Sequence, residues 1–149
     1  MNIKALFVFE KKNDKVTRIS SSDKFFTALF EILEGKRTKY MGDLAHSFGL
    51  YFRKLNLEKS DPLVITLFTL IRNIKLQQPP GNIKSFIYNR SIINKLISGY
   101  KHEEAKILGI LFDNCYHIIF KTNNRDDISK RLNNFSIFFE HILMQIPAN

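Results

Sequence analysis

The sequence is poor in the residues that build disulfides, tight turns and membrane spans. Its 149 residues include one cysteine, no tryptophan, six glycines and four prolines. One cysteine excludes an internal disulfide and a cysteine-rich zinc site, and it favours a reduced, cytoplasmic setting. Scarce glycine and proline favour helices over a turn-rich β fold. Because no run of about 18 apolar residues is present, we expect no transmembrane helix, and the N-terminus lacks the features of a signal peptide.

Motifs for catalysis and for cofactor binding are also absent. The four histidines have no partner at ligand spacing, and the chain contains no HExxH, CxxC or GxSxG motif and no glycine-rich phosphate loop. Cys115 lies on an apolar stripe, as expected of a small core residue. We therefore expect no metal, no cofactor and no catalytic residue, and interpret the protein as a non-enzyme. An enzyme stays an alternative only if carboxylates converge on a cleft.

Apolar residues make up 44% of the chain and recur at helical spacing, which predicts one all-α domain over residues 1–149. Residues 1–20 are expected to form a short β-hairpin or an extended lead-in, and residues 22–147 a bundle of about six helices. The expected helices cover roughly residues 22–35, 38–55, 60–76, 82–98, 102–120 and 126–146. The third is apolar nearly all round, so we expect it to be the buried central helix.

Local signals refine these expected helices. Gly35 ends the first helix as a C-cap glycine does. Asn82 is expected to cap the start of the fourth helix, after a Pro-Pro-Gly break. Gly42 and Gly49 weaken the second helix locally, and each allows close approach of a neighbouring element. Pro147 is expected to end the last helix.

Positive charge is concentrated in the middle of the chain. Between Lys36 and Lys101 there are twelve Lys or Arg residues and three acids, a net charge of +9, whereas the rest of the chain is neutral. Clustered positive charge is typical of a surface that contacts phosphate. Because no motif reaches base edges, we expect contact with the nucleic-acid backbone without sequence readout. The alternatives are charge that serves only solubility and an acidic protein partner.

Eight of these cations are the candidate nucleic-acid-binding residues, and we expect them to share one continuous surface. They are Lys36, Arg37, Lys39, Arg53, Lys54, Lys84, Arg90 and Lys95. Cations at helix C-termini, such as Arg53 and Lys54, also stabilise the helix dipole, so their positions have a structural explanation as well.

Tyrosines lie among these cations. Tyr40, Tyr51 and Tyr88 could stack on nucleobases of a single strand, or they could be half-buried at the edge of the core. One side of the fourth expected helix, opposite its apolar face, presents Lys84, Tyr88, Ser91 and Lys95. This helix therefore combines cations with an aromatic ring on one predicted face.

Three short stretches carry a resemblance to a known family. They are residues 30–44 (FEILEGKRTKYMGDL), 90–96 (RSIINKL) and 104–114 (EAKILGILFDN). Their order and approximate spacing resemble the helical C-terminal part of large subunits of type I CRISPR Cascade complexes, which is similar to the free-standing Cascade small subunit. The resemblance covers residues 24–146.

The resemblance implies a non-catalytic helical subunit of a ribonucleoprotein. Such a subunit contacts the guide RNA–target DNA complex, supports the displaced DNA strand of the R-loop, and binds other Cascade subunits and copies of itself. In such complexes guide pairing reads the sequence, while protein contacts the backbone. The alternative is a helical interaction or regulatory module that binds a partner helix or an acidic protein in a hydrophobic groove.

Overall fold

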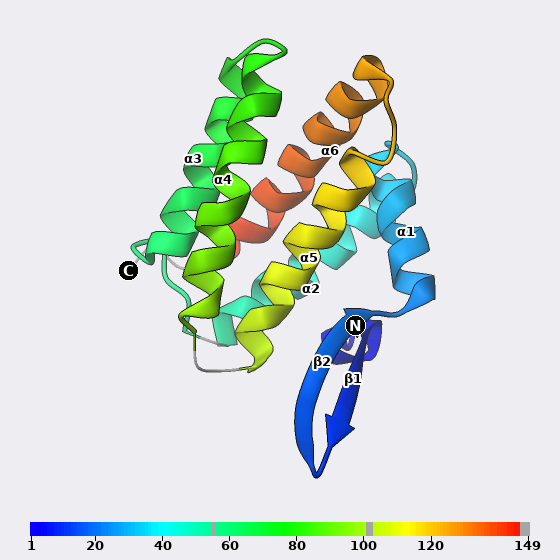
Figure 1. The fold of residues 1–149 in the computed structure, drawn as a ribbon, viewed down its shortest axis with the longest axis vertical. Coiled ribbons are helices and arrows are strands. Elements are labelled where there is room, and N and C mark those ends of the chain that lie inside the picture. The colour runs from blue at the N-terminus through cyan, green and yellow to red at the C-terminus, as the bar shows by residue number, and fades with distance from the viewer. Residues whose placement is uncertain (55, 101–102, 147–149) are drawn as a thin grey trace.

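Six α-helices and an N-terminal β-hairpin make up the computed structural model, which describes residues 1–54, 56–100 and 103–146 (Figure 1). A 3₁₀ turn, η1 (Ile3–Leu6), leads into strands β1 (Phe7–Lys12) and β2 (Lys15–Ser21). The helices are α1 (Asp23–Leu33), α2 (Thr38–Lys54), α3 (Pro62–Leu76), α4 (Gly81–Ser98), α5 (Glu103–Ile119) and α6 (Arg125–Leu143). The predicted helical bundle with a short N-terminal hairpin is confirmed. The predicted roles of Leu55, His102 and Pro147 fall outside the described residues.

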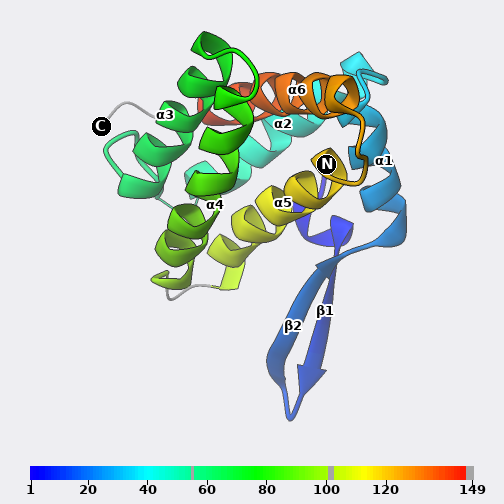
Figure 2. The same cartoon turned by 45° about the horizontal axis from the view of Figure 1, so that its top comes forward.

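The hairpin owes its shape to a two-residue turn. Asn13 and Asp14 have φ angles of 53° and 63°, which suit the type I′ turn favoured by the right-handed twist of paired strands. At the other end of the hairpin, Phe7 is buried, and its ring lies 5.5 Å from the ring of Phe25 in α1. The base of the hairpin is therefore anchored in the core, while its tip extends away from the helices (Figure 2).

Capping residues set several helix boundaries. The Ser22 hydroxyl accepts a hydrogen bond from the Phe25 N–H at 3.2 Å at the start of α1. The Asp61 carboxylate accepts one from the Leu63 N–H at 2.9 Å at the start of α3. Gly35, with φ of 83°, follows α1 in a Schellman motif, as its sequence position predicted. The predicted N-cap role of Asn82 was wrong, because α4 already begins at Gly81.

The fourth helix begins earlier than predicted. α4 starts at Gly81, and Pro80 precedes it without a side-chain cap. The carboxamide oxygen of Asn82 accepts a hydrogen bond from the N–H of the next residue, Ile83, at 2.8 Å. Asn82 is buried inside the first turn of α4. Its side chain therefore accepts a hydrogen bond from a main-chain N–H of that turn, but Asn82 does not occupy the N-cap position before the helix.

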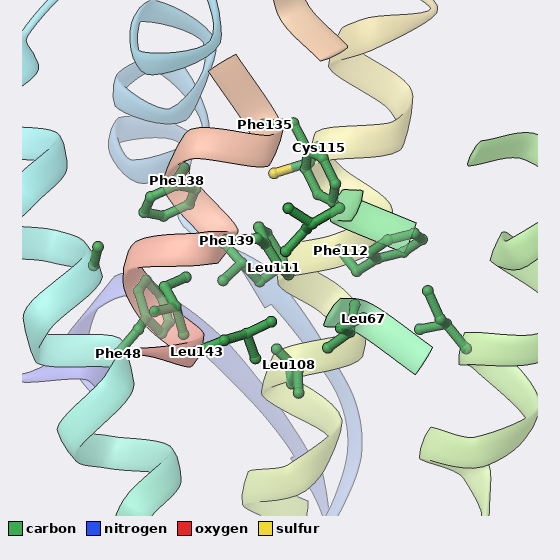
Figure 3. Packing of buried hydrophobic residues seen from close by; sticks show 14 of the residues in the cluster. Phe48, Leu67, Leu108, Leu111, Phe112, Cys115, Phe135, Phe138, Phe139 and Leu143 are labelled. Carbon is green, nitrogen blue, oxygen red and sulfur yellow. The ribbon is translucent and has the colours of Figure 1, made fainter. Parts of the chain in front are cut away.

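The central position in the core belongs to α6. This helix packs against α1, α2, α3 and α5. The Phe138 ring lies 6.5 Å from that of Phe48 in α2, and the Phe139 ring lies 6.1 Å from that of Phe112 in α5 (centroid distances; Figure 3). One continuous cluster of buried apolar side chains therefore runs from α2 through α6 to α5.

The expectation that residues 60–76 form the central helix was wrong. Figures 1 and 2 show α3 at the outer edge of the bundle beside α4. One side of α3 is buried against α4 and α6 through Leu63, Val64, Leu67, Leu70, Ile71 and Ile74. On its other side, Ile65 is 51% exposed and Leu76 is 71% exposed. Because α3 has an apolar residue on nearly every side, periodicity alone could not identify the outward face.

One of the two glycines in α2 allows a close approach. A Cβ on Gly49 would lie 2.4 Å from the Cβ of Gln145 and 2.9 Å from the carbonyl oxygen of Ile142, where α2 meets the end of α6. A Cβ on Gly42 would have no neighbouring heavy atom within 4 Å. Across residues 1–54, 56–100 and 103–146, none of the helices combines the length and the apolar character that a membrane crossing requires.

Candidate nucleic-acid interface

Three of the eight predicted contact residues lie at the corner between α1 and α2. Lys36 and Arg37 belong to the link, Lys39 lies in the first turn of α2, and all three are exposed. The Arg37 Nε is 3.8 Å from the Glu31 carboxylate, and its guanidinium lies 4.2 Å from the centre of the Tyr40 ring. Arg37 therefore has local partners, whereas Lys36 and Lys39 form no ion pair with any described residue.

Arg53 and Lys54 lie at the opposite end of the same helix. They are the last two residues of α2, and both are exposed. At 1.5 Å per residue, Lys39 and Arg53 are separated by about 21 Å along the helix axis. The two residues therefore form a second group, whose cations also complement the negative end of the helix dipole.

The outer face of α4 has the arrangement that its spacing predicted. Lys84, Tyr88, Ser91 and Lys95 are all exposed on one stripe. Tyr88 is 70% exposed, unlike Tyr40, which is half-buried. Lys84 and Lys95 lie on either side of Tyr88, about 6 Å and about 10 Å away along the axis. Two ammonium groups and an accessible aromatic ring therefore share one surface.

Arg90 points away from this stripe and toward α5. Its Nε donates a hydrogen bond to Asp113 Oδ1 at 3.3 Å, and its guanidinium lies 4.0 Å from the centre of the Tyr116 ring. The side chain is half-buried between the two helices. These contacts give Arg90 a structural role in holding α4 against α5, and they direct its guanidinium toward α5.

The eight cations therefore do not form one group on the surface. α2 packs mainly on α6, whereas α4 packs on α3 and α5. Figures 1 and 2 show the α1–α2 corner on the side of the bundle opposite the α3–α4 pair. The expectation of one continuous surface was wrong, because charge clustered in the sequence is distributed by the helices over several sides of the bundle.

The α3–α4 helix pair concentrates positive charge most clearly. Residues 62–98 contain five cations and no acid. Two of the five are paired across helices, Lys75 with Glu140 of α6 and Arg90 with Asp113 of α5. Within the described part of the chain, the remaining three, Arg72, Lys84 and Lys95, are exposed and have no ion-pair partner.

Sequence reasoning missed two surfaces. The first is the outer side of α3, beside a hollow of about 610 Å³ that is lined by Phe68, Thr69, Ile71, Arg72, Lys75, Leu76 and Glu140. Thr69 and Arg72 share one helical side, and these two polar residues were the signal that this side faces solvent. The second is the hairpin, which presents the exposed cations Lys11, Lys12, Lys15 and Arg18 beside the acids Glu10 and Asp14.

Other ionisable groups have structural roles. Glu34 lies 2.6 Å from Lys130 Nζ and accepts a hydrogen bond from Arg131 Nε at 2.7 Å, which links α1 to α6. The hydrogen bond from Lys130, assisted by Arg131, holds the pKa of Glu34 below its ordinary value despite partial desolvation. Arg131 is buried and also donates to the Ile118 carbonyl oxygen at 2.8 Å. This network therefore joins the end of α1 to α5 and α6.

Cys115 is a core residue. Cys115 is fully buried among apolar side chains, and burial raises the pKa of its thiol (Figure 3). No three His, Cys, Asp or Glu side chains come close enough to hold a metal ion in the part of the chain that the structure describes.

Comparison with known proteins identified no relatives. No protein-family model, no curated protein and no solved structure matches the chain.

Proposed function

We propose that the protein is a non-catalytic helical subunit that binds the sugar-phosphate backbone of single-stranded nucleic acid through the outer face of α4. The observation that carries this proposal is the exposed stripe of Lys84, Tyr88, Ser91 and Lys95 on a helix pair that contains no acid. In this proposal the subunit works in a ribonucleoprotein of the Cascade kind and supports a displaced DNA strand. The resemblance of residues 24–146 supports the Cascade setting, and the exposed stripe on α4 supports backbone binding.

The stripe has the chemistry that backbone binding needs. Lys84 and Lys95 can each neutralise a phosphate and release its condensed counterions, which favours binding at low salt. The exposed ring of Tyr88 offers a nucleobase a stacking surface that is indifferent to sequence. The absence of acids over residues 62–98 removes a source of repulsion. Such a face binds strands without reading their bases.

The salt dependence of binding tests the proposal. The probe is a fluorescein-labelled oligothymidine of about 16 nucleotides, a length that spans a binding site of this kind. In the double variant Lys84→Gln/Lys95→Gln, the slope of log affinity against log salt should become shallower by about 1.4, since each lost single-strand phosphate contact removes about 0.7. Tyr88→Ala should weaken binding by about 1–3 kcal/mol through lost stacking.

A matched double variant distinguishes a specific face from total charge. Lys36→Gln/Lys39→Gln removes the same two charges from the α1–α2 corner, on the other side of the bundle. The proposal requires this variant to keep a slope near that of the wild type. Equal flattening by both double variants would show a diffuse charge effect and would refute the α4 face.

Arg90 provides a second control on the same helix. Because Arg90 is paired with Asp113, Arg90→Gln should lower the thermal midpoint and leave the salt slope nearly unchanged. A slope that flattens as much as in a lysine variant would assign Arg90 to the contact surface instead.

The Cascade setting has its own test. A gene for a Cascade backbone protein beside this reading frame, together with co-purification of that protein, would support it. Intact oligothymidine binding without such a gene or partner would refute the Cascade setting and leave backbone binding in place.

A further inference from the structure

The outer side of α3 presents an apolar stripe that no described residue covers. Ile65, Phe68 and Leu76 recur at the spacing of one helical side, with Thr69 and Arg72 between them. Ile65 and Leu76 are 51% and 71% exposed, and Phe68 is half-buried at the edge of the 610 Å³ hollow. A helix that is apolar on nearly every side is normally covered on every side.

We propose that this stripe is the docking site for an amphipathic helix of an acidic partner protein. A partner helix can place its own apolar residues against Ile65, Phe68 and Leu76 and fill the adjoining hollow. The ion pair between Lys75 and Glu140 borders the hollow, so Lys75 already has a partner of opposite charge within this chain. The inference concerns a different helix and a different partner from the α4 face, and it does not depend on nucleic-acid binding.

The charge of the stripe identifies the partner as acidic. Arg72 lies between Phe68 and Leu76 in the stripe, is exposed, and forms no ion pair with any described residue. A docked helix would remove water from this guanidinium, so a carboxylate must face it if docking is to be favourable. Arg72 would then form a charge-assisted, bidentate contact that fixes the register of the partner helix.

The same charge argues against a second copy of this chain as the occupant. Antiparallel pairing of two α3 stripes about their midpoint would place the two Arg72 side chains about 4–5 Å apart along the axis, with no acid nearby. Parallel pairing would place them side by side. Each copy also carries a net charge of +9, so self-association would bring like charges together at the centre and over the whole molecule.

A displayed peptide library tests the proposal without a known partner. The probe is a phage library of amphipathic helices of about 18 residues, a length that spans α3. Their apolar stripe is fixed, and each polar position is randomised among Glu, Lys, Gln and Ser. Selection on the wild-type protein should enrich Glu, and the best peptide should bind at least about tenfold more weakly to the double variant Ile65→Gln/Leu76→Gln. Arg72→Glu should abolish the preference for Glu and enrich Lys.

A matched variant on another helix shows whether the α3 stripe itself binds the peptide. Ile87→Gln changes a similarly exposed isoleucine on α4, 46% exposed against 51% for Ile65, and should leave peptide affinity unchanged. Thermal midpoints of the surface variants should stay within about 2 °C of the wild type, because exposed positions tolerate substitution.

Several results would overturn the proposal. These are no enrichment, enrichment of Lys by the wild-type protein, and peptide affinity that is unaffected by Ile65→Gln/Leu76→Gln. Sedimentation velocity can give one further refuting result. If the wild type forms a concentration-dependent dimer and this double variant does not, a second copy of the chain is the occupant. Oligothymidine binding that the α4 variants leave unchanged would refute the proposed function alone and would leave this docking site intact.

Discussion

Substitution of the two glycines of α2 by alanine should change stability in opposite directions. Both lie inside the helix, so each Gly→Ala change gains about 0.8–1.0 kcal/mol of helix propensity. At Gly42 the new methyl group has no heavy atom within 4 Å. Gly42→Ala should therefore be stabilising by nearly the full propensity gain.

At Gly49 the same methyl group has no space. It would lie 2.4 Å from both Cβ and Cγ of Gln145 and 2.9 Å from the Ile142 carbonyl oxygen. Because two of these three atoms are close to or in the main chain, the end of α6 must shift to relieve the overlap. Overpacking of this kind typically costs about 1–3 kcal/mol. The propensity gain is common to both variants and cancels, so Gly49→Ala should be less stable than Gly42→Ala by about that amount.

Urea unfolding followed by circular dichroism measures this difference directly. With a denaturant slope of about 1–3 kcal/mol per molar urea for small proteins, the two midpoints should differ by an easily resolved fraction of a molar unit or more. Equal urea midpoints for Gly42→Ala and Gly49→Ala would refute the close crossing of α2 and α6. Equal denaturant slopes would confirm that the native states differ in free energy and not in compactness.

Three further predictions follow from local contacts. The pKa of Glu34 is lower in the folded protein than its ordinary value, so its stabilising contribution is complete above the ordinary carboxyl range and is lost as pH falls through the folded value. Glu34→Gln should lower the free energy of unfolding by about 1.5–3 kcal/mol near neutral pH, and the stability of this variant should fall less steeply on acidification than that of the wild type. An equally steep fall in both proteins would contradict a lowered pKa of Glu34. Cys115 should react with a thiol reagent only in denaturant, because its thiol is buried and its pKa is raised; rapid reaction under native conditions would show that the core opens readily. Asp14→Gly should raise hydrogen-exchange protection of the hairpin, because glycine adopts the positive φ of that turn position at least cost; unchanged protection would indicate that the turn does not limit hairpin opening.

Features set by neighbouring residues could be predicted from the sequence. Gly35 defines the end of α1 through contacts within a few residues, so the stop signal in the sequence identified it. The exposed stripe from Lys84 to Lys95 also follows from helical spacing alone, because its four members recur at intervals of three or four residues along α4. The six-helix pattern was predictable for the same reason.

Features set by distant residues could not be predicted. Gly42 and Gly49 look alike in sequence, and only the distant Gln145 distinguishes them. Arg90 counted as a surface cation until the packing of α5 against α4 brought Asp113 to it. These outcomes depend on which helix lies beside which, and a list of charges or apolar residues along one chain does not contain that information.

The central position of α6 also bears on the order in which the molecule can form during synthesis. α1 to α5 leave the ribosome before α6, whose phenylalanines join the two sides of the core. Until α6 emerges, α2 lacks its main partner, and α1 and α5 have each other but lack the side of the core that α6 supplies. Apolar surface that stays exposed at this stage favours aggregation. The core that joins the two sides of the bundle can therefore close only after α6 has left the ribosome.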